Sequence, residues 1–358
     1  MVRFCLERAI KLGVTSRKRL HEAVYRELRE KYPSYPSHYV YTAITQALAM
    51  FKSYRRLSRR GKNVSPPEIK NLNTVLLDDA HLFWFSWGSL KLATHRGHVV
   101  VPFEVHEHSR KFIGWQVKGA RLVRRGGSFF LHVTFRKAVE EREPEGVLGI
   151  DVNERSIDLI VVKPDKVKFV RIDISEAKCV RDRYFRKRRN IQKKTSGETK
   201  ARLLAKYSRR EKQRVNDILH RASKIIARIV AEENVKPVME RLTDMREKIR
   251  YGRKMNRRLH SMPFRKIQLY ISYKSMEQGF NPEFVDAKNT SRTCPICGEL
   301  NKPNGHVFKC KECGFQADRH FVAAWNIAAK LPMCRPLPLA AKATEAFEAE
   351  VERIVIEC

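Results

Sequence analysis

Four cysteines near the C-terminus have the types and spacing of a metal site. They form two C-x-x-C pairs, Cys294 with Cys297 and Cys310 with Cys313, and twelve residues separate the pairs. Each pair places two thiolates on one side of an ion, so two pairs complete a tetrahedral four-cysteine zinc site. Because four protein ligands leave no open position for substrate, this zinc is structural. The alternative is four unrelated buried thiols.

Glycines and the remaining cysteines refine this prediction. Gly298 and Gly314 each follow a pair and suit the tight turn in which the backbone passes close to sulfur. The spacing of the other cysteines indicates no disulfide pairs, so they are predicted to be free thiols in a reducing cytosol. These cysteines are Cys5, Cys179, Cys334 and Cys358. No apolar stretch approaches eighteen residues and the first twenty residues are too basic for a signal peptide, so we expect a cytoplasmic protein.

Three acidic residues, far apart in sequence, have the context of a magnesium site. Asp151 ends an apolar strand, Glu240 ends a later one, and Asp318 opens an alanine-rich helix. Hydrolysis of a polynucleotide by two metal ions needs carboxylates brought together in this way, and Mg²⁺ prefers such hard oxygen ligands. Each acid is alternatively a turn or cap residue. Asp158 and Asp173 are nearby alternatives that rank lower.

The elements expected to position these acids follow the order of an RNase H-like domain. Hydrophobic patterning predicts a three-stranded meander, then helices with an apolar stripe, then a buried strand and a late helix. The predicted segments are 146–150, 157–162, 167–172, 175–233, 235–239 and 321–329. Small Ala323 and Ala324 would let the last helix approach the strands closely.

The N-terminal part has a different character. Residues 1–60 show helical spacing of apolar residues, with Pro33 and Pro36 between two helices. Aromatic and β-branched runs then predict strands within 82–87, 98–101 and 129–135, in a β-barrel or curled sheet. We expect the aromatic residues of this region to lie in its core rather than to stack on bases.

The charge of the chain indicates a polyanionic partner. Its 73 Lys and Arg against 39 Asp and Glu give a formal charge of +34. Residues 178–214 alone carry sixteen basic residues against three acidic ones, and a second cluster surrounds Tyr251. Nucleic acid is the expected partner, and a membrane surface or a ribosomal-type scaffold is the alternative. The predicted phosphate-binding residues are Arg186, Lys187, Arg188, Arg189, Arg253, Lys254, Arg257 and Arg258.

An ordered set of motifs resembles the TnpB (OrfB) family, the insertion-sequence-encoded relatives of type V CRISPR effectors. The resemblance covers residues 10–333. The matching motifs are Gly149-Ile-Asp-Val-Asn153, Glu240-Arg-Leu242, Asn256-Arg-Arg-Leu259 with Pro263-Phe264, Thr290-Ser-Arg-Thr-Cys-Pro-Ile-Cys-Gly298 and Cys310-Lys-Glu-Cys-Gly314 leading into Asp318-Arg319.

This resemblance implies an RNA-guided DNA endonuclease with a structural zinc and catalytic magnesium. The RuvC-like triad would fall on Asp151, Glu240 and Asp318, and the partners would be a guide RNA and a double-stranded DNA target, with no membrane. The chain would be a monomer or dimer. The implied domains are a helical module (1–75), a β-barrel or wedge-like region (76–140), an α/β RuvC-like domain with inserted basic helices (146–293), an inserted zinc ribbon (294–314), a last RuvC-like segment (315–333) and a tail (334–358).

One departure from the family pattern leaves an alternative open. Family members often show Asp-Arg-Asp followed by Asn-Ala-Ala, whereas this chain has His320 at the second acid and Val322 at the asparagine. Histidine is a poor ligand for Mg²⁺. The alternative function is therefore a nuclease-dead, RNA-guided DNA-binding protein that acts as a repressor, and a further one is guide-independent RNA binding.

Overall fold

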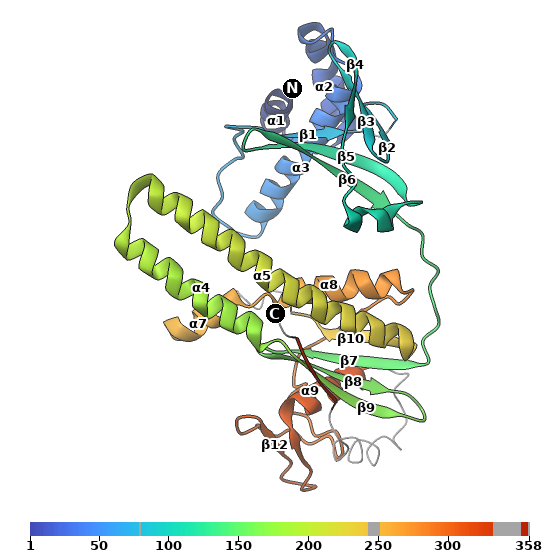
Figure 1. Cartoon of the computed structure of the whole chain (residues 1–358), viewed down its shortest axis with the longest axis vertical. Helices are drawn as coiled ribbons and strands as arrows, with labels where there is room; N and C mark the ends of the chain where they lie inside the picture. The colour runs from blue at the N-terminus through green and yellow to red at the C-terminus, as the bar shows by residue number, and fades with distance from the viewer. Residues whose placement is uncertain (79, 243–250, 332–351, 357–358) are drawn as a thin grey trace. The chain divides into compact units, whose positions relative to one another are not determined.

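The chain divides into two compact units, Met1–Ala138 and Val139–Cys358, which are described separately. The structure is a computed structural model that describes residues 1–78, 80–242, 251–331 and 352–356 (Figure 1). Two of the scattered cysteines, Cys334 and Cys358, lie outside these ranges, as does Arg250 of the second basic cluster. No helix in the described ranges is long and apolar enough to cross a bilayer.

The N-terminal unit begins with the predicted helices. They are α1 (Val2–Lys11), α2 (Arg17–Lys31) and α3 (His38–Arg59). Apolar residues of all three helices form one buried cluster that includes Leu6, Val24 and Ile44. Gly13 follows α1 with a φ of +63°, a conformation that ends a helix at little cost for glycine. The predicted break at the two prolines falls between α2 and α3 and is confirmed.

Strands follow in the same unit, in the three aromatic runs and in others that the sequence did not reveal. In the described residues they form two three-stranded antiparallel sheets, in the orders β1-β5-β6 and β2-β3-β4. The elements are β1 (Thr74–Leu77), β2 (Phe83–Ser86), β3 (Ser89–Thr94), β4 (Gly97–Pro102), a 3₁₀ helix η1 (Glu107–Phe112), β5 (Gln116–Arg125) and β6 (Ser128–Arg136). A closed barrel stays a prediction.

The expectation that the aromatic residues of this region lie in its core holds only in part. Phe83 is fully buried among Leu77, Leu82 and Leu90. Phe129 and Phe130, in contrast, have exposed fractions of 66% and 47%. The prediction is wrong for these two residues, because both side chains lie in the stretch of β6 next to its turn and no described part of the chain buries them.

The C-terminal unit is built around a mixed sheet. Among the described residues its strand order is β11-β10-β7-β8-β9-β14. The strands are β7 (Gly146–Val152), β8 (Ser156–Val162), β9 (Val167–Asp173), β10 (Val235–Glu240), β11 (Glu283–Val285) and β14 (Glu352–Val355). β8 is antiparallel to β7 and β9, whereas β10, β11 and β14 add in parallel. The predicted meander and the later buried strand are confirmed.

Helices cover both faces of this sheet. The long α4–α5 pair and α8 cover one face, where Leu148, Ile218 and Ile271 belong to one buried cluster. The helix α9 covers the other face, where Val147, Ile160 and Phe321 belong to a second cluster. The bounds are α4 (Ser175–Lys194), α5 (Gly197–Glu232), α7 (Arg253–Ser261), α8 (Phe264–Glu277) and α9 (Arg319–Ala328). Successive residues of a strand point to opposite faces of the sheet, so each strand packs alternate residues against α9 and against the α4, α5 and α8 layer.

Close approach of α9 to the sheet depends on a glycine in β7. A Cβ atom at Gly149 would lie 2.2 Å from the carbonyl oxygen of Ala324 and 2.9 Å from the Cβ of Ala328. The small residues of α9 were expected to allow this approach. The close approach also requires the glycine of the strand, because the backbone of α9 packs directly over Gly149.

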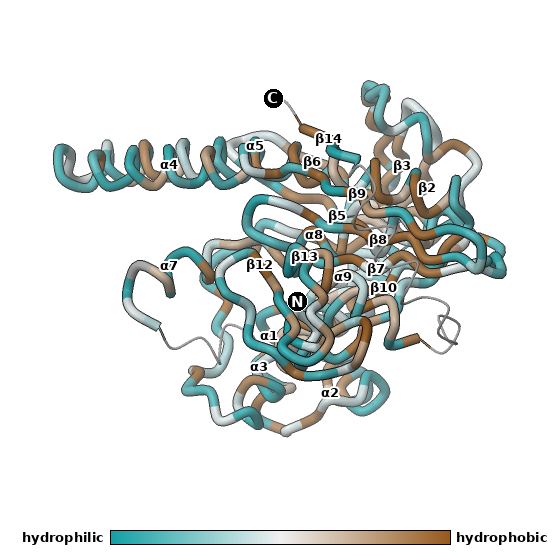
Figure 2. Tube along the Cα trace, turned by 90° about the horizontal axis from the view of Figure 1, so that it is seen from below, coloured by the Kyte–Doolittle hydropathy of each residue, from teal (hydrophilic) through white to brown (hydrophobic). Residues whose placement is uncertain are grey.

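The helices α4 and α5 form an antiparallel hairpin that extends beyond the sheet (Figure 1). The end of α5 near the sheet carries buried residues from Val215 to Val230, whereas none before Val215 is buried. Figure 2 shows the far end of the hairpin mostly in the hydrophilic colour. The basic segment predicted between residues 178 and 214 is therefore anchored near the sheet by Val180 and Tyr184, and its remainder forms an extended, solvated arm.

Candidate metal centres and nucleic-acid interface

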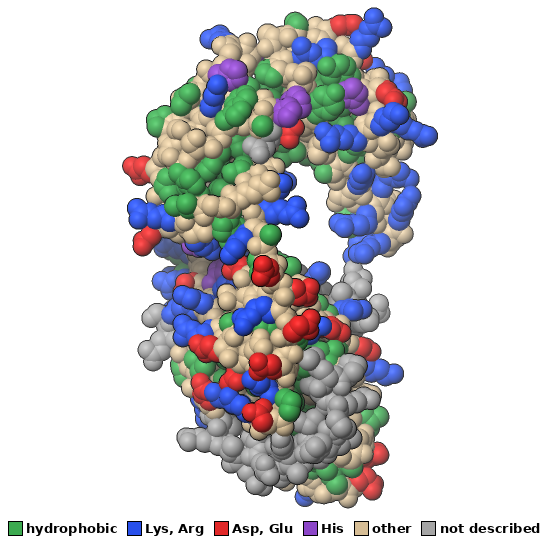
Figure 3. All heavy atoms as spheres, turned by 90° about the vertical axis from the view of Figure 1, so that its right-hand side faces the viewer, with side chains coloured by type: hydrophobic (Ala, Val, Ile, Leu, Met, Phe, Trp, Pro, Cys, Tyr) green, Lys and Arg blue, Asp and Glu red, His purple; other side chains and the backbone are tan. Residues whose placement is uncertain are grey.

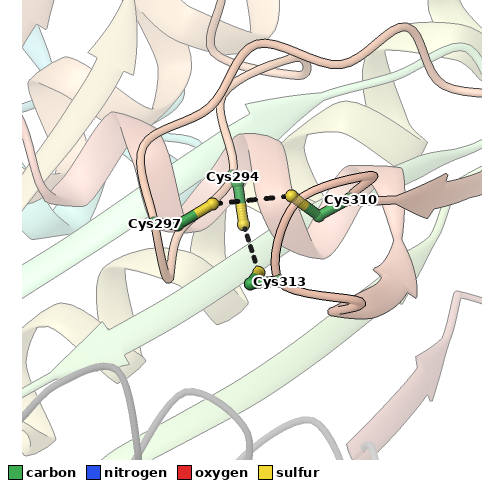
Figure 4. Close-up of side chains that lie close together, drawn as sticks. All are labelled: Cys294, Cys297, Cys310 and Cys313. Atoms are coloured by element: carbon green, nitrogen blue, oxygen red, sulfur yellow. Dashed lines mark hydrogen bonds between the residues drawn. The ribbon is translucent and has the colours of Figure 1, made fainter.

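The four predicted zinc ligands come together in one cluster (Figure 4). The Sγ atoms of Cys294 and Cys313 are 3.6 Å apart, and those of Cys297 and Cys310 are 3.5 Å apart. In a tetrahedral site with metal–sulfur bonds of about 2.3 Å, neighbouring sulfurs are about 3.8 Å apart. Disulfide sulfurs lie about 2.05 Å apart, so these cysteines are not disulfide-bonded. The cluster fits a tetrahedral metal ion.

The segment between the two pairs folds around this cluster. A short hairpin of β12 (Val307–Lys309) and β13 (Gln316–Asp318) carries the second pair. Gly298 and Gly314 adopt φ values of +80° and +75°, and a Cβ atom at either would meet nothing within 4 Å. Glycine is therefore needed at these positions for the left-handed backbone conformation. The sequence had suggested a different reason, the close passage of the backbone near sulfur.

Asn301 supports the cysteine cluster and was not predicted. Its side chain is 5% exposed, and its amide donates to the Sγ of Cys310 at 3.4 Å. Its carbonyl oxygen accepts from the backbone N–H of Lys311 at 3.1 Å. An amide that donates to sulfur stabilises the thiolate form, which is the form that binds metal.

On the α9 face of the sheet, strand register aligns charged residues in one row. Asp151 in β7 pairs with Asp158 in β8, and Asp158 pairs with Arg171 in β9. Directly paired residues project to the same face, so these three side chains are neighbours. On the other side of β7, Met239 pairs with Ile150, which brings Glu240 level with Asp151. We call Glu240, Asp151, Asp158 and Arg171 the charged row.

The centre of the charged row meets the first turn of α9. Asp151, Asp158 and His320 each offer a ligand atom within 4.8 Å of the others. The Nδ1 of His320 lies 3.1 Å from Oδ2 of Asp151, and these two residues are 9% and 7% exposed. Asn153 donates to Asp151 at 2.6 Å and to Asp158 at 3.0 Å. The group could hold one cation with mixed nitrogen and oxygen ligands.

Asp318, the third predicted catalytic acid, has other partners. Its Oδ1 accepts from the backbone N–H of His320 at 2.8 Å, which makes Asp318 the N-cap of α9. Its Oδ2 lies 3.1 Å from Arg171, whose Nε is 2.5 Å from Asp158. Asp158 is fully buried; burial raises the pKa of its carboxyl, and Arg171 partly opposes that shift. The arginine thus bridges the two acids and offsets one of their two charges.

Glu240, the second predicted acid, accepts from the Thr290 hydroxyl at 2.5 Å. Burial raises the pKa of Glu240 to about 7, and the charge of Asp151 adds to that shift while the Thr290 hydrogen bond opposes it. Asn326 in α9 donates to the carbonyl oxygens of Thr290 and Thr293, both at 2.7 Å. The segment that leads into the cysteine cluster is therefore tied to Glu240 and to α9.

Of the three predicted catalytic acids, the fold thus places Asp151 and Glu240 on adjacent strands, whereas Asp318 faces Arg171. Asp158, which ranked lower in the sequence, lies at the centre of the row. The other alternative, Asp173, accepts from the backbone N–H of Ser175 at 2.7 Å and so begins α4. No local motif reveals the role of Arg171, because only the register of β9 against β8 brings it to the acids.

The predicted phosphate-binding residues separate into exposed side chains and half-buried side chains that pair within the protein. Arg186, Lys187 and Arg189 in α4 and Arg253 at the start of α7 are exposed. Three others have protein partners: Arg188 pairs with Glu211, Arg258 with Glu154, and Arg257 lies 4.0 Å from the centre of the Phe185 ring. The side chain of Lys254 lies outside the described part of the chain. Tyr251 is 64% exposed, so a ring is available beside Arg253.

Together, these features define an α/β protein with a four-cysteine cluster that could bind zinc and a row of charged side chains between a mixed sheet and a late helix. Comparison with curated proteins gives the family. The TnpB-like protein MJ0751 of Methanocaldococcus jannaschii is 34% identical over 260 residues, covering 70% of this chain and 93% of the relative. The TnpB-like protein aq_aa05 of Aquifex aeolicus is 28% identical, covering 59% and 76%. The chain belongs to the TnpB family, which is related to type V CRISPR effectors.

Partial matches agree with this assignment. The family described as Cas12f1-like, TNB domain, matches residues 264–327, and the uncharacterized protein MJ0013 family matches residues 1–93. The CRISPR-associated endodeoxyribonuclease Cas12f1 of Sulfoacidibacillus thermotolerans is 33% identical over 113 residues, 30% of this chain and 25% of the relative. The match of the first family spans the cysteine cluster and most of α9.

Solved structures give only a weak likeness. A CRISPR-Cas12f ternary complex has a TM-score of 0.44 at 15% identity, covering 91% of this chain and 79% of that chain. A Cas12f1-sgRNA-target DNA complex has a TM-score of 0.42 at 19% identity, covering 92% and 94%. These TM-scores are too low to establish a common architecture.

Proposed function

We propose that this chain is an RNA-guided DNA-targeting protein of the TnpB type. Membership of the family, at 34% identity over 93% of a curated relative, carries the proposal. The charge of +34 and the exposed basic arm of α4 and α5 support a long polyanionic ligand. In this proposal the C-terminal unit is RuvC-like, the cysteine cluster is a zinc ribbon, and the N-terminal unit holds the guide RNA.

The basic arm would bind RNA and heteroduplex through phosphates, leaving the sequence to base pairing. RNA affinity should therefore fall steeply with salt, with a log–log slope of magnitude above roughly five. RNA that copurifies with the tag-free protein should be sequenced, and one defined species should be enriched over total RNA. A flat salt response together with RNA of random sequence would contradict the proposal.

The geometry of the charged row favours target binding without efficient cleavage. A two-magnesium centre needs several ionised carboxylates free to face two ions. Here His320 contacts Asp151, and Arg171 pairs with both Asp158 and Asp318. This donor set fits two Mg²⁺ ions poorly, so the proposed role is that of an RNA-guided repressor.

The second candidate is the endonuclease predicted from the sequence, in which Asp151, Glu240 and Asp318 hold Mg²⁺. The side-by-side position of Asp151 and Glu240 favours it, as does the similarity to the CRISPR-associated endodeoxyribonuclease Cas12f1. A plasmid-cleavage assay and a DNA-binding assay, run with the same protein, guide RNA and Mg²⁺, separate the two. Binding without cutting supports the repressor; cutting that Asp151→Ala abolishes, with RNA binding intact, supports the nuclease.

A further inference from the structure

The N-terminal unit contains a group of metal-ligating side chains that the proposed function does not use. His38, Asp78 and His81 each offer a ligand atom within 4.8 Å of the others. The Nδ1 of His38 lies 3.1 Å from the Oδ2 of Asp78, and the rings of His38 and His81 have centroids 3.8 Å apart. All three belong to the first compact unit, so the group is distinct from the cysteine cluster and from the charged row.

The fold holds these side chains on well-anchored backbone. His38 is the first residue of α3, and the helix packs through Val40 and Ala43 into the helical core. Asp78 and His81 lie in the short connection between β1 and β2, with the buried Leu77 on one side and Leu82 on the other.

A tight turn brings Asp78 and His81 together. The backbone N–H of Leu82 donates to the carbonyl oxygen of Asp78 at 2.9 Å. Ala80 has a φ of +58°, which costs a non-glycine residue about 1 kcal/mol or more. Strained residues of this kind persist where the surrounding structure fixes them.

The donor set selects a class of metal. Two imidazole nitrogens and one carboxylate oxygen suit borderline divalent ions such as Zn²⁺, Ni²⁺ and Co²⁺, whereas Mg²⁺ prefers oxygen alone. With bonds of about 2.0–2.1 Å, two ligands are about 2.9 Å apart at a right angle and about 3.4 Å apart at the tetrahedral angle. The separation of 3.1 Å between His38 and Asp78 lies in this interval.

The alternative is a simple ion pair between His38 and Asp78, with the His81 ring tilted at 44° against that of His38. As they lie, the two imidazoles are about an ångström closer than two rings that share one metal, so His81 has to turn slightly for binding. His81 is exposed, so a metal ion can reach its ring from solvent. The carboxylate of Asp78 is already oriented towards His38, so two of the three ligands need no rearrangement.

We infer that His38, Asp78 and His81 form a second metal site that binds a borderline divalent transition-metal ion. Three protein ligands leave at least one position for water or for an oxygen of a bound ligand. The ion joins the start of α3 to the β1–β2 connection, and it stabilises the N-terminal unit because it binds only the folded chain.

The test uses the full, tag-free chain with its cysteine cluster loaded with zinc. NiCl₂ is titrated by calorimetry, and nickel and zinc contents are measured by elemental analysis after dialysis. We expect the wild type to bind one nickel equivalent more than His81→Ala does, with zinc unchanged, and to show an increase in Tm. His81→Ala should weaken nickel binding at least tenfold and abolish the Tm increase, and Asp78→Asn should weaken it about tenfold.

His132→Ala is the matched control, because His132 is an exposed histidine of the same unit outside the group. It should bind nickel as the wild type does. Equal nickel binding by the wild type and His81→Ala would overturn the inference, as would an equal loss in His132→Ala. Either result leaves the proposed RNA-guided function untouched, because RNA binding is measured separately.

Discussion

Replacement of His320 by aspartate tests the reasoning about the charged row most directly. His320 takes the position of the second acid in the family motif, and its Nδ1 lies 3.1 Å from Asp151. His320→Asp restores a carboxylate at this position. The substitution does not remove the backbone N–H of residue 320, which donates to the side chain of the N-cap residue Asp318. The variant therefore changes the ligand set without removing the helix cap.

The expected size of the effect follows from the burial of the pair. Two carboxylates about 4 Å apart repel by about 4 kcal/mol at an effective dielectric constant of about 20. Protonation of one of them limits this cost, so without metal the free energy of unfolding should fall by about 2–4 kcal/mol. Mg²⁺ should reverse the loss. If the restored ligand contributes about 3 kcal/mol to the transition state, cleavage should rise about 10²-fold.

The assay combines thermal unfolding with plasmid cleavage. Tm is measured for wild type and His320→Asp with and without Mg²⁺, and guide-dependent cleavage is measured with the same preparations. His306→Asp is the control for charge, because the exposed His306 ring lies 5.5 Å from that of His320 but is not part of the acidic group. It should change neither the Mg²⁺ dependence of Tm nor cleavage.

The reasoning would be refuted by a wild type that already cuts as fast as His320→Asp. It would also fail if the variant bound target normally but showed no Mg²⁺-dependent rise in Tm. In that case position 320 does not contribute to a metal centre. Asp318 would then have to supply the third ligand, and it would have to break its helix-cap hydrogen bond and its ion pair with Arg171 to do so.

Three further predictions follow from other parts of the molecule. Removal of metal by a chelator should make the four clustered cysteines react with iodoacetamide at pH 8, as measured by mass spectrometry. Cys5 should stay unlabelled, because burial raises the pKa of its thiol to about 11. Gly149→Ala should lower the free energy of unfolding in urea by about 1–3 kcal/mol, because the added Cβ would overlap α9. Gly252→Ala is the control: the position has open space and a φ of −60°, so the free energy of unfolding should change by no more than about 0.5 kcal/mol. Arg186→Gln with Arg189→Gln should reduce the magnitude of the salt slope of RNA binding by about 1.4, if each contacts one phosphate of a single strand.

Much of the architecture could be predicted from the sequence because its signals are local. The apolar runs of the meander, the stripe of α5 and the cysteine spacing each depend on near neighbours in the chain, and the structure contains all three. Strands β3 and β5 were missed because their alternation is broken by lysine, arginine and glycine. The edge strand β14 was missed because four residues of mixed polarity carry no periodic signal.

The candidate site was predictable only in part, because it depends on register. Asp151 and Glu240 end apolar strands, and that context marks them in the sequence. Arg171 lies in the middle of a strand and reaches the acids only through its pairing with Asp158. Thr290 and Asn301 lie next to the cysteines, but their partners are a distant acid and a sulfur that only the fold brings near.

The charged row itself limits the number of cations that the centre can hold. Asp158 is fully buried, and an isolated buried carboxylate would take up a proton or require a counter-ion. Arg171 supplies that counter-ion at 2.5 Å and reaches Asp318 with the same guanidinium. A second metal ion near Asp158 would have to displace this arginine from two acids at once. A single cation bound between Asp151 and His320 would leave this arginine in place, so we propose that the row holds at most one ion.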